Sequence, residues 1–467
     1  MNLSGLGERF ANFYRKYIPN SMVFAFTMTI LVMLLALIFT DSNLITLLES
    51  WYTGMWELLG FSMQVVLMLI LGYAMAVSPQ FNQLIKLLAR YLKTPRQVYF
   101  LIPLIGALLC LVNWTWLILT AVLAREIAKE VKGIHYPYLM GITYFSGLSW
   151  VSGISSTVLL LLNTPDNYLI QNEVITNVLP TALTLGSRVN YVMVGFFVIV
   201  VPVICWLLAP VYHKKQSLDA LLITNTNVAK KTDPKQKNER IEAKKHLSGW
   251  VENVALFPYI IVTLGLSYII YHFYSNGFEL NLNIVIFIFM MLALLLHRTP
   301  AQFGKAIKEA SGNISGVIIQ YPFYAGIMGI FTFAGLGEVF ANSLSEVMTL
   351  DNYIFYSYGI GGAVNFAIPG AGGEFAIIGP GILQAVTDLS ARLPPEVVNE
   401  NLARATLAIT YGENCTNMLQ PFFFMVFIIP IMGVGTNIQS KDIMGYLFLP
   451  FVLSVVFQLL IVAFVPV

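Results

Sequence analysis

Two glutamates in long apolar segments are the residues best placed to do chemistry. Glu374 and Glu413 are each the only formally charged residue in their segments, 353–385 and 406–430. A charge at membrane depth costs at least about 2.5–3.5 kcal/mol, so such residues usually face a cavity and serve a transport pathway. Because burial favours the protonated form of a carboxyl group, both are candidates for binding a coupling ion. A protonated or paired structural role is the alternative for each.

Glu374 ends a glycine-rich stretch that begins at Asn365. We expect five residues here to be unable to continue a regular helix: Pro369, Gly370, Gly372, Gly373 and Pro380. A helix that resumes after such a break exposes backbone N–H groups and the positive end of its dipole, which suits a carboxylate. We therefore predict that the stretch from Asn365 to Glu374 binds an anionic substrate and also forms a tight turn.

A second asparagine occupies the matching place in the first half of the chain. Asn113 lies in the tip sequence Leu111–Trp116, as Asn365 lies in its own. The Asn side chain offers both donors and an acceptor, so it can satisfy a broken backbone or a ligand. We predict that both asparagines contact the substrate or the coupling ion. Helix capping is the alternative for either one alone.

Polar residues also interrupt two apolar spans. They are Ser152, Ser155, Ser156, Thr157, Asn163 and Thr164 in the first half, and Asn414, Thr416, Asn417 and Gln420 in the second. Unwound carbonyls and hydroxyls are suitable ligands for Na⁺, and polar breaks of this kind also bind substrates. A Ser or Thr in a membrane helix often bonds only to its own helix, which is the alternative for each hydroxyl.

Composition places these residues in a membrane protein. The 467-residue chain is 57% hydrophobic and 11% charged, whereas a soluble domain carries roughly a quarter charged residues. Apolar runs near the ~20 residues needed to span hydrocarbon recur along the chain. The net charge of +2 argues against a nucleic-acid partner. Three isolated cysteines, without CxxC spacing, are expected to be small buried hydrophobes.

The placement of Lys and Arg predicts a re-entrant hairpin over residues 98–124. Spans at about 22–40 and 58–78 enclose a loop with acidic residues but no base, which we assign to the outer face. Basic segments then flank the 28 residues of Gln97–Ala124 on both sides, so both flanks are cytoplasmic. Two full passes would need roughly 40 residues. Two short tilted spans are the alternative to a hairpin.

The second half repeats this pattern with the opposite orientation. We predict a first half (1–212), a basic cytoplasmic linker (213–250), a connecting span (251–281) and a second half (282–467) with its own hairpin at about 353–385. Surface helices near 81–89 and 338–346 are purely basic and purely acidic, respectively. The predicted fold is an all-α polytopic membrane protein with about nine spans and two re-entrant hairpins. Inverted repeats with matching interruptions are typical of secondary transporters.

Enzyme and channel functions fit the sequence less well. No Asp falls inside a predicted span, and all five histidines lie in loops or at span ends. The sequence contains no HExxH, P-loop or GxGxxG motif, so no nucleotide or cofactor is expected beyond Na⁺ or H⁺ as coupling ion. A channel would need a continuous polar pore, whereas facing hairpins favour an occluded site.

Several motifs in order resemble the bacterial short-chain fatty acid transporters of the acetoacetate-operon type, within the ion transporter superfamily. They are Cys110–Trp114, Ala124–Ala128, Tyr136–Pro137, Asn163–Pro165, Leu296–Pro300, Gln320–Gly326, Asn365–Pro369, Tyr411–Glu413, Asn417–Met418, Gln420–Phe422 and Asp442–Tyr446. The resemblance implies cation-driven uptake of acetoacetate or butyrate through the inner membrane. The wider superfamily implies a homodimer with a fixed scaffold and a mobile carrier part.

One residue departs from the pattern of the family. Glu374 stands where family members often have a His or another non-acidic residue. A carboxylate there would repel an anionic substrate unless it were protonated or paired. An amino acid or another amine-bearing substrate is therefore an alternative; the alternative carriers of the same fold transport amino acids or dicarboxylates. The charge pattern further predicts a cytoplasmic N-terminus and an external C-terminus.

Overall fold

The computed structural model describes residues 21–57, 59–80, 83, 87, 91–210, 216–222, 251–277, 280–311, 315–365, 370–420, 423–433 and 435–467. Within these ranges the chain is helical, and its only β-type pairing is an isolated bridge between Leu222 and Thr436. The predicted all-α class is thereby confirmed. Six described segments are long and apolar enough to cross a membrane, namely Leu44–Met75, Pro95–Val112, Tyr136–Leu162, Arg188–Leu207, Leu256–Asn276 and Asp442–Phe464.

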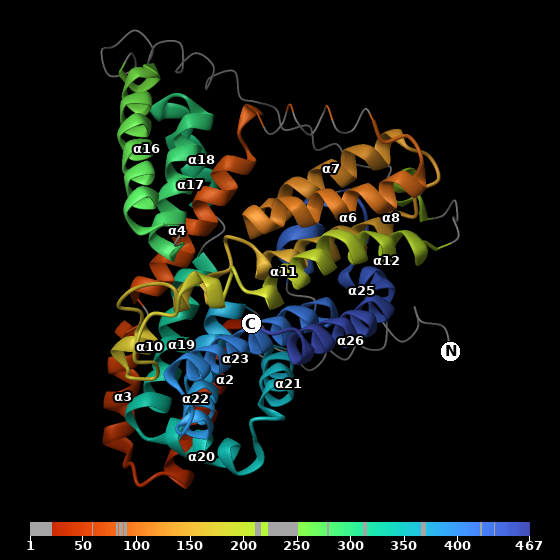
Figure 1. The fold of residues 1–467 in the computed structure, drawn as a ribbon. Helices are drawn as coiled ribbons and strands as arrows, with labels where there is room; N and C mark the ends of the chain where they lie inside the picture. The colour runs from red at the N-terminus through yellow and green to blue at the C-terminus, as the bar shows by residue number, and fades with distance from the viewer. Residues whose placement is uncertain are drawn as a thin grey trace.

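A first group of helices packs around α19 and α4 and lies on the left of Figure 1. We call it the α19 bundle. It consists of α2 (Ser21–Phe39), α3 (Leu44–Glu57), α4 (Leu59–Ala76), α16 (Leu256–Asn276), α17 (Leu282–His297), α18 (Pro300–Ser311), α19 (Ser315–Phe333) and α20 (Leu336–Val347).

The predicted loop between the first two spans is wrong, because helix α3 occupies it. Leu47, Ser50 and Gly54 recur at helical spacing and are buried. A β-carbon at Gly54 would lie 2.5 Å from the Gly329 Cα, so the α3 and α19 backbones cross in close contact. Glu49 is exposed on the same helix. Acidic residues on the exposed side of an amphipathic helix give the same charge pattern as an outer loop.

A second group carries the first hairpin and the first interrupted span. It contains α6 (Pro95–Val112), η1 (Trp114–Trp116), α7 (Leu117–Glu130), α8 (Tyr136–Gly147), η2 (Leu148–Ser152), α9 (Thr157–Leu162), α10 (Tyr168–Gln171), η3 (Thr181–Leu183), α11 (Arg188–Gly195), η4 (Phe196–Val200) and α12 (Val201–Leu207). Helices α6 and α7 contact each other and are joined by the turn at Asn113.

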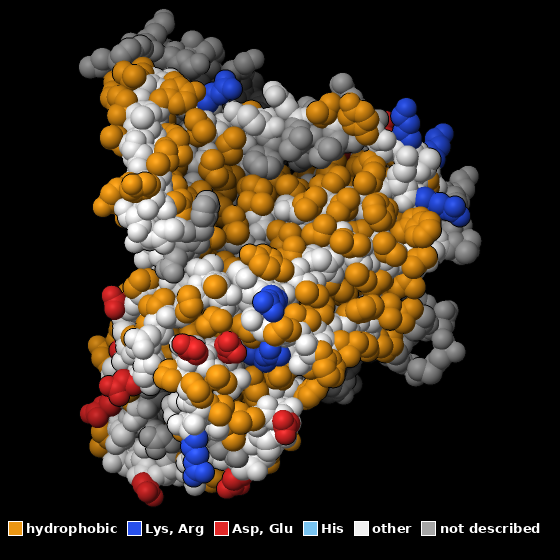
Figure 2. Space-filling view, viewed as in Figure 1, with side chains coloured by type: hydrophobic (Ala, Val, Ile, Leu, Met, Phe, Trp, Pro, Cys, Tyr) orange, Lys and Arg blue, Asp and Glu red, His pale blue; other side chains and the backbone are white. Residues whose placement is uncertain are grey.

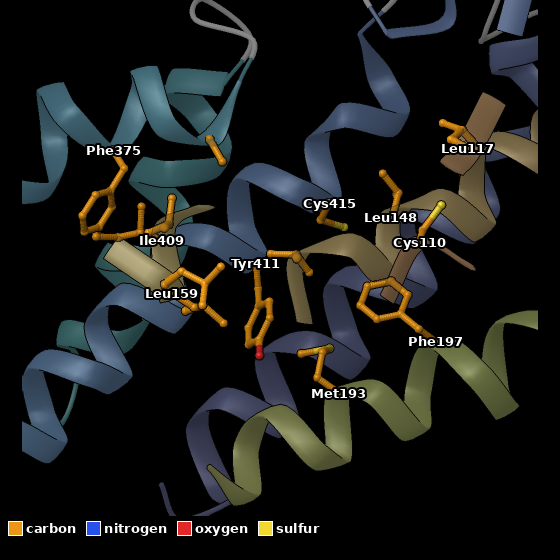
Figure 3. Close-up of a cluster of buried hydrophobic side chains, with 14 of the residues drawn as sticks. Cys110, Leu117, Leu148, Leu159, Met193, Phe197, Phe375, Ile409, Tyr411 and Cys415 are labelled. Carbon is orange, nitrogen blue, oxygen red and sulfur yellow. The ribbon is translucent and has the colours of Figure 1, made fainter. Parts of the chain in front are cut away.

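A third group carries the second hairpin and the second interrupted span. It contains α21 (Tyr353–Asn365), α22 (Ala371–Ser390), α23 (Pro395–Thr416), η6 (Asn417–Leu419), η7 (Phe424–Ile428), α24 (Ile429–Met432), α25 (Ser440–Met444), η8 (Gly445–Leu447) and α26 (Phe448–Phe464). Figure 3 shows apolar side chains of this group, among them Phe375 and Ile409, in one buried cluster with Leu148 and Cys110 of the second group.

The prediction that the glycine run and Pro380 stay outside a helix is wrong in part. Pro369 lies outside the described residues, Gly370 lies before α22 with φ +129°, and the helix contains Gly372, Gly373 and Pro380. At Gly373 the glycine is explained by packing, because a β-carbon there would meet the Tyr324 ring at 3.2 Å. The glycine therefore permits close contact between α22 and α19 rather than ending the helix.

Other predicted features are only partly covered by the described residues. The acidic surface helix is present as α20, whereas most of residues 81–89 lie outside the described ranges. Within the predicted linker, Leu218–Leu221 forms the short helix α13 and contacts α7; most of the remainder also lies outside. All three cysteines are free thiols and buried, as predicted.

The surface in Figure 2 is apolar over its broad middle. Lys and Arg side chains lie along the upper edge of this face and also in its middle and lower part, whereas most Asp and Glu side chains lie in its lower half. A broad apolar surface of this kind is expected of a chain that lies in a bilayer.

Candidate functional site

Asn365 lies against the second helix break, where α23 ends and the 3₁₀ turn Asn417–Leu419 begins. Its Nδ2 donates to the backbone carbonyl oxygen of Glu413 at 3.0 Å and to Thr416 Oγ1 at 2.9 Å. A third contact joins the same nitrogen to Asn417 Oδ1 at 3.1 Å. The end of α21 is therefore held to the end of α23, where the helix turns into η6.

A chain of side-chain amides then leads to the Glu413 carboxylate. Gln420 Nε2 donates to Asn417 Oδ1 at 2.6 Å, and Asn417 Nδ2 donates to Glu413 Oε1 at 2.9 Å. Three buried oxygens around this chain have no hydrogen-bond partner in the described structure: Glu413 Oε2, Asn365 Oδ1 and Gln420 Oε1. The second break therefore contains several buried acceptor atoms that a cation or a proton donor could satisfy.

Glu374 is close enough to Glu413 to interact with it electrostatically. It lies in the first turn of α22, and neither of its carboxylate oxygens has a partner in the described structure. Among the described residues these two are the only buried acidic side chains, and no Lys or Arg side chain is buried. Two like charges in an apolar interior repel strongly, so the pair requires a proton or a bound cation.

The first break is held to the first hairpin in a similar way. Asn113 Oδ1 accepts from Thr115 N at 2.9 Å and from Thr115 Oγ1 at 2.6 Å. Trp114 N donates to Ser155 Oγ at 3.0 Å. A β-carbon at Gly153 would lie 2.2 Å from the Leu111 carbonyl oxygen, so only glycine fits between tip and break.

The remaining predicted residues of the first break divide into two sets. Ser152, Ser156 and Thr157 are buried at the break. Asn163 and Thr164 lie beyond it and hold the end of α9. Asn163 Nδ2 donates to the Leu179 carbonyl oxygen at 2.6 Å, and Thr164 Oγ1 donates to the Leu160 carbonyl oxygen at 2.7 Å.

A hydrogen-bond bridge that the sequence did not predict connects the two breaks. Tyr411 Oη donates to Asn190 Oδ1 at 2.9 Å, and Asn190 Nδ2 donates to the Ser152 carbonyl oxygen at 3.0 Å. Asn190 stands on α11, and its position at the start of an apolar span was the only available signal. In Figure 3 Tyr411 lies between Leu159 and Met193.

Tyr411→Phe is expected to lower the thermal stability of the purified protein. Oδ1 of the Asn190 side chain would lose its donor, and an unsatisfied buried acceptor costs about 1–3 kcal/mol. Thermal unfolding in detergent measures the change. Tyr191→Phe is the matched control, because Tyr191 is 64% exposed. Equal melting temperatures for the two variants would contradict the bridge.

Known proteins resemble this chain along nearly its whole length. The family model described as "Short chain fatty acid transporter" matches residues 2–465. A provisionally named short-chain fatty acid transporter of Haemophilus influenzae is 31% identical over 449 residues, which is 95% of this chain and 96% of that protein. One of Escherichia coli, named in the same way, is 32% identical over 437 residues, which is 93% of each chain.

Two solved structures are similar in fold. The Alcanivorax borkumensis YdaH transporter has a TM-score of 0.56 at 13% identity, covering 94% of this chain and 97% of its own. Neisseria gonorrhoeae MtrF, described as one of a class of antimetabolite efflux pumps, has a TM-score of 0.50 at 10% identity, covering 96% of this chain and 95% of its own. At such identities the similarity concerns the fold alone.

Proposed function

Because the chain belongs to the short-chain fatty acid transporter family, we propose that it moves acetoacetate- or butyrate-like monocarboxylates across the bacterial inner membrane by cation symport. The family makes it a membrane transporter and not an enzyme. The observation that carries the proposal is the pair of helix breaks, each bonded to a residue of a hairpin tip, Trp114 in the first half and Asn365 in the second. Matching breaks of this kind form the substrate and ion sites of secondary transporters.

Both hairpins are proposed to be re-entrant, one in each of two inverted halves, 1–212 and 282–467. The proposed chain has about nine spans, a cytoplasmic N-terminus and an external C-terminus. Complete burial of Asn113 and Asn365 supports tips that end inside the protein. Irregular backbone at membrane depth is stable only where protein or a water-filled cavity surrounds it.

The transport step is proposed to be of the elevator type. The α19 bundle would be the fixed scaffold, and the hairpins with the interrupted spans would be the carrier. The Tyr411–Asn190–Ser152 bridge supports this division, because it ties the two breaks together within the proposed carrier. A homodimer, as the wider superfamily implies, would hold the scaffold still.

The coupling ion is proposed to be Na⁺ or H⁺, bound at Glu413 with Glu374, and with the hairpin-tip asparagines Asn113 and Asn365 as further ligand candidates. The buried, uncompensated charge of the two glutamates supports this assignment. A cation that enters with an anionic substrate would also remove the repulsion between that substrate and the two carboxylates.

Proteoliposomes containing the purified protein are expected to accumulate labelled butyrate when a Na⁺ or pH gradient is imposed. The two gradients are applied separately, and uptake is compared with that of empty liposomes. Accumulation under one gradient identifies the coupling ion. Absence of uptake under both gradients would contradict the proposal.

A second substrate class follows from the same two glutamates. Without a buried Lys or Arg among the described residues, the pair could attract the ammonium group of an amino acid. The proteoliposome assay with labelled amino acids distinguishes this alternative. Accumulation of an amino acid in place of butyrate would favour it.

A further inference from the structure

A groove lies where three segments of the second group meet, away from the helix breaks. It is lined by the start of α6, by Gly133 in the turn between α7 and α8, and by the end of α12, and its volume is about 870 Å³. Gly133 has φ +87°, a conformation that favours glycine. A β-carbon there would lie 3.3 Å from Pro95 Cγ, so this turn packs against the first residue of α6. The wall of the groove is therefore set by the backbone.

The groove lies at the ends of two apolar segments. Pro95–Val112 and Arg188–Leu207 are each long and apolar enough to cross a membrane, and the first turn of one and the last turn of the other line the groove. The ends of such segments lie at the level of the lipid headgroups. Figure 2 shows Lys and Arg side chains at the right-hand edge of the apolar surface, near the ends of α7 and α12 in Figure 1. A ligand of this groove therefore meets both headgroups and water.

The lining of the groove combines one cation with exposed apolar side chains. Arg96 is exposed, and none of the residues that line the groove is acidic. Neither of the two ion pairs in the described part of the chain includes Arg96. Trp206 and Leu207 line the same groove and are 42% and 64% exposed. The groove thus offers an anion a positive charge beside an apolar wall.

The start of α6 assigns the anion to the Arg96 side chain rather than to the helix backbone. Pro95 has no N–H group, and the Gln97 N–H donates to Thr94 Oγ1 at 3.3 Å. The Gln97 side chain accepts in turn from the Thr94 N–H at 3.1 Å, which completes a capping box. The guanidinium group presents parallel N–H groups that match two oxygens of a phosphate.

We propose that this groove binds an anionic phospholipid, with the Arg96 guanidinium on the phosphate and with Trp206 and Leu207 against the glycerol and the upper acyl chains. Basic pockets between membrane helices on the cytoplasmic side bind anionic headgroups, and the charge pattern predicts that side here. Lys93 and Lys132 are exposed and adjoin lining residues, so they add positive charge. A zwitterionic headgroup would place its own cation among these bases, and free phosphate would leave the apolar wall uncovered.

The test is the melting temperature of delipidated full-length protein in a neutral detergent, titrated with dioleoyl phosphatidylglycerol. A lipid that joins α6 to α12 is expected to raise it. Arg96→Gln should need at least about fivefold more of this lipid for the half-maximal shift, because one arginine near an anionic headgroup is lost. Lys308→Gln is the matched control, since it removes the same charge from an exposed position on α18. Trp206→Ala, which removes part of the apolar wall, should also need more lipid.

Three further titrations decide what the groove binds. Dioleoyl phosphatidylcholine as effective as phosphatidylglycerol would overturn the anionic headgroup, and inorganic phosphate as effective as the lipid would overturn the lipid itself. Native mass spectrometry counts the bound phosphatidylglycerol molecules, and Arg96→Gln should retain one fewer than Lys308→Gln. Equal lipid requirements of these two variants would overturn the site. Butyrate is absent throughout, so the result does not depend on the proposed function.

Discussion

Replacing Glu413 with Gln is expected to reduce gradient-driven accumulation of butyrate by about 100-fold, which corresponds to about 2.8 kcal/mol of lost cation binding. The Gln side chain keeps an oxygen for Asn417 Nδ2, so the contact at 2.9 Å survives. The substitution removes one buried negative charge and, with it, the electrostatic repulsion between residue 413 and Glu374. The folded yield should therefore be retained while the cation site is lost.

Butyrate uptake into proteoliposomes under separate Na⁺ and pH gradients measures the effect, and size-exclusion chromatography measures the folded yield. Glu49→Gln is the matched control, because Glu49 is exposed on α3 and should transport like the wild type. A Glu413→Gln variant with unchanged dependence on both gradients would remove Glu413 from the coupling role.

Replacing Gly361 with Ala is expected to prevent normal packing of the second hairpin. A β-carbon at Gly361 would lie 2.4 Å from the Ile409 carbonyl oxygen, and one at Gly412 would lie 2.0 Å from the Tyr358 carbonyl oxygen. The two helix backbones touch at these glycines, and a backbone atom cannot rotate away. We expect a cost at or above the upper end of the roughly 1–3 kcal/mol typical of overpacking.

Gly359 supplies a control two residues away on the same helix. A β-carbon there would meet no heavy atom within 4 Å, so Gly359→Ala should be neutral or stabilising by up to about 1 kcal/mol. Melting temperature and folded yield in detergent are compared for the two variants. Similar behaviour of both would show that the α21–α23 crossing has room for a side chain.

The helical class and the places of the interruptions follow from the sequence. Runs of apolar residues of membrane length predict helices because backbone groups in hydrocarbon must bond within their own segment. The breaks near Ser152 and Asn417 were predicted from clusters of polar residues, and the structure has non-α backbone at both. Helix α3 was missed because its Glu49 and Glu57 outweighed the apolar face that α19 covers.

The site was predictable in residue type but not in detail. Asn113, Asn365 and Glu413 were predicted because polar atoms are costly in an apolar segment. Asn365 bonds to the Glu413 carbonyl oxygen at the second break, whereas Asn113 bonds to Thr115 at its own hairpin tip. Asn163 and Thr164 carried the same signal, yet they bond to the backbone around α9. Spacing along a chain shows that a polar side chain is buried, but not which neighbour satisfies it.

The sequence by itself determined that two carboxylates are buried, because Glu374 and Glu413 are the only charged residues in two long apolar segments. The tertiary structure alone decided that Asn190 and Tyr411 connect the breaks across 221 positions of the chain. It also decided which end of each hairpin-tip amide remains free. Those choices depend on backbone groups from distant segments, and a hydrogen bond forms only where folding brings donor and acceptor within reach.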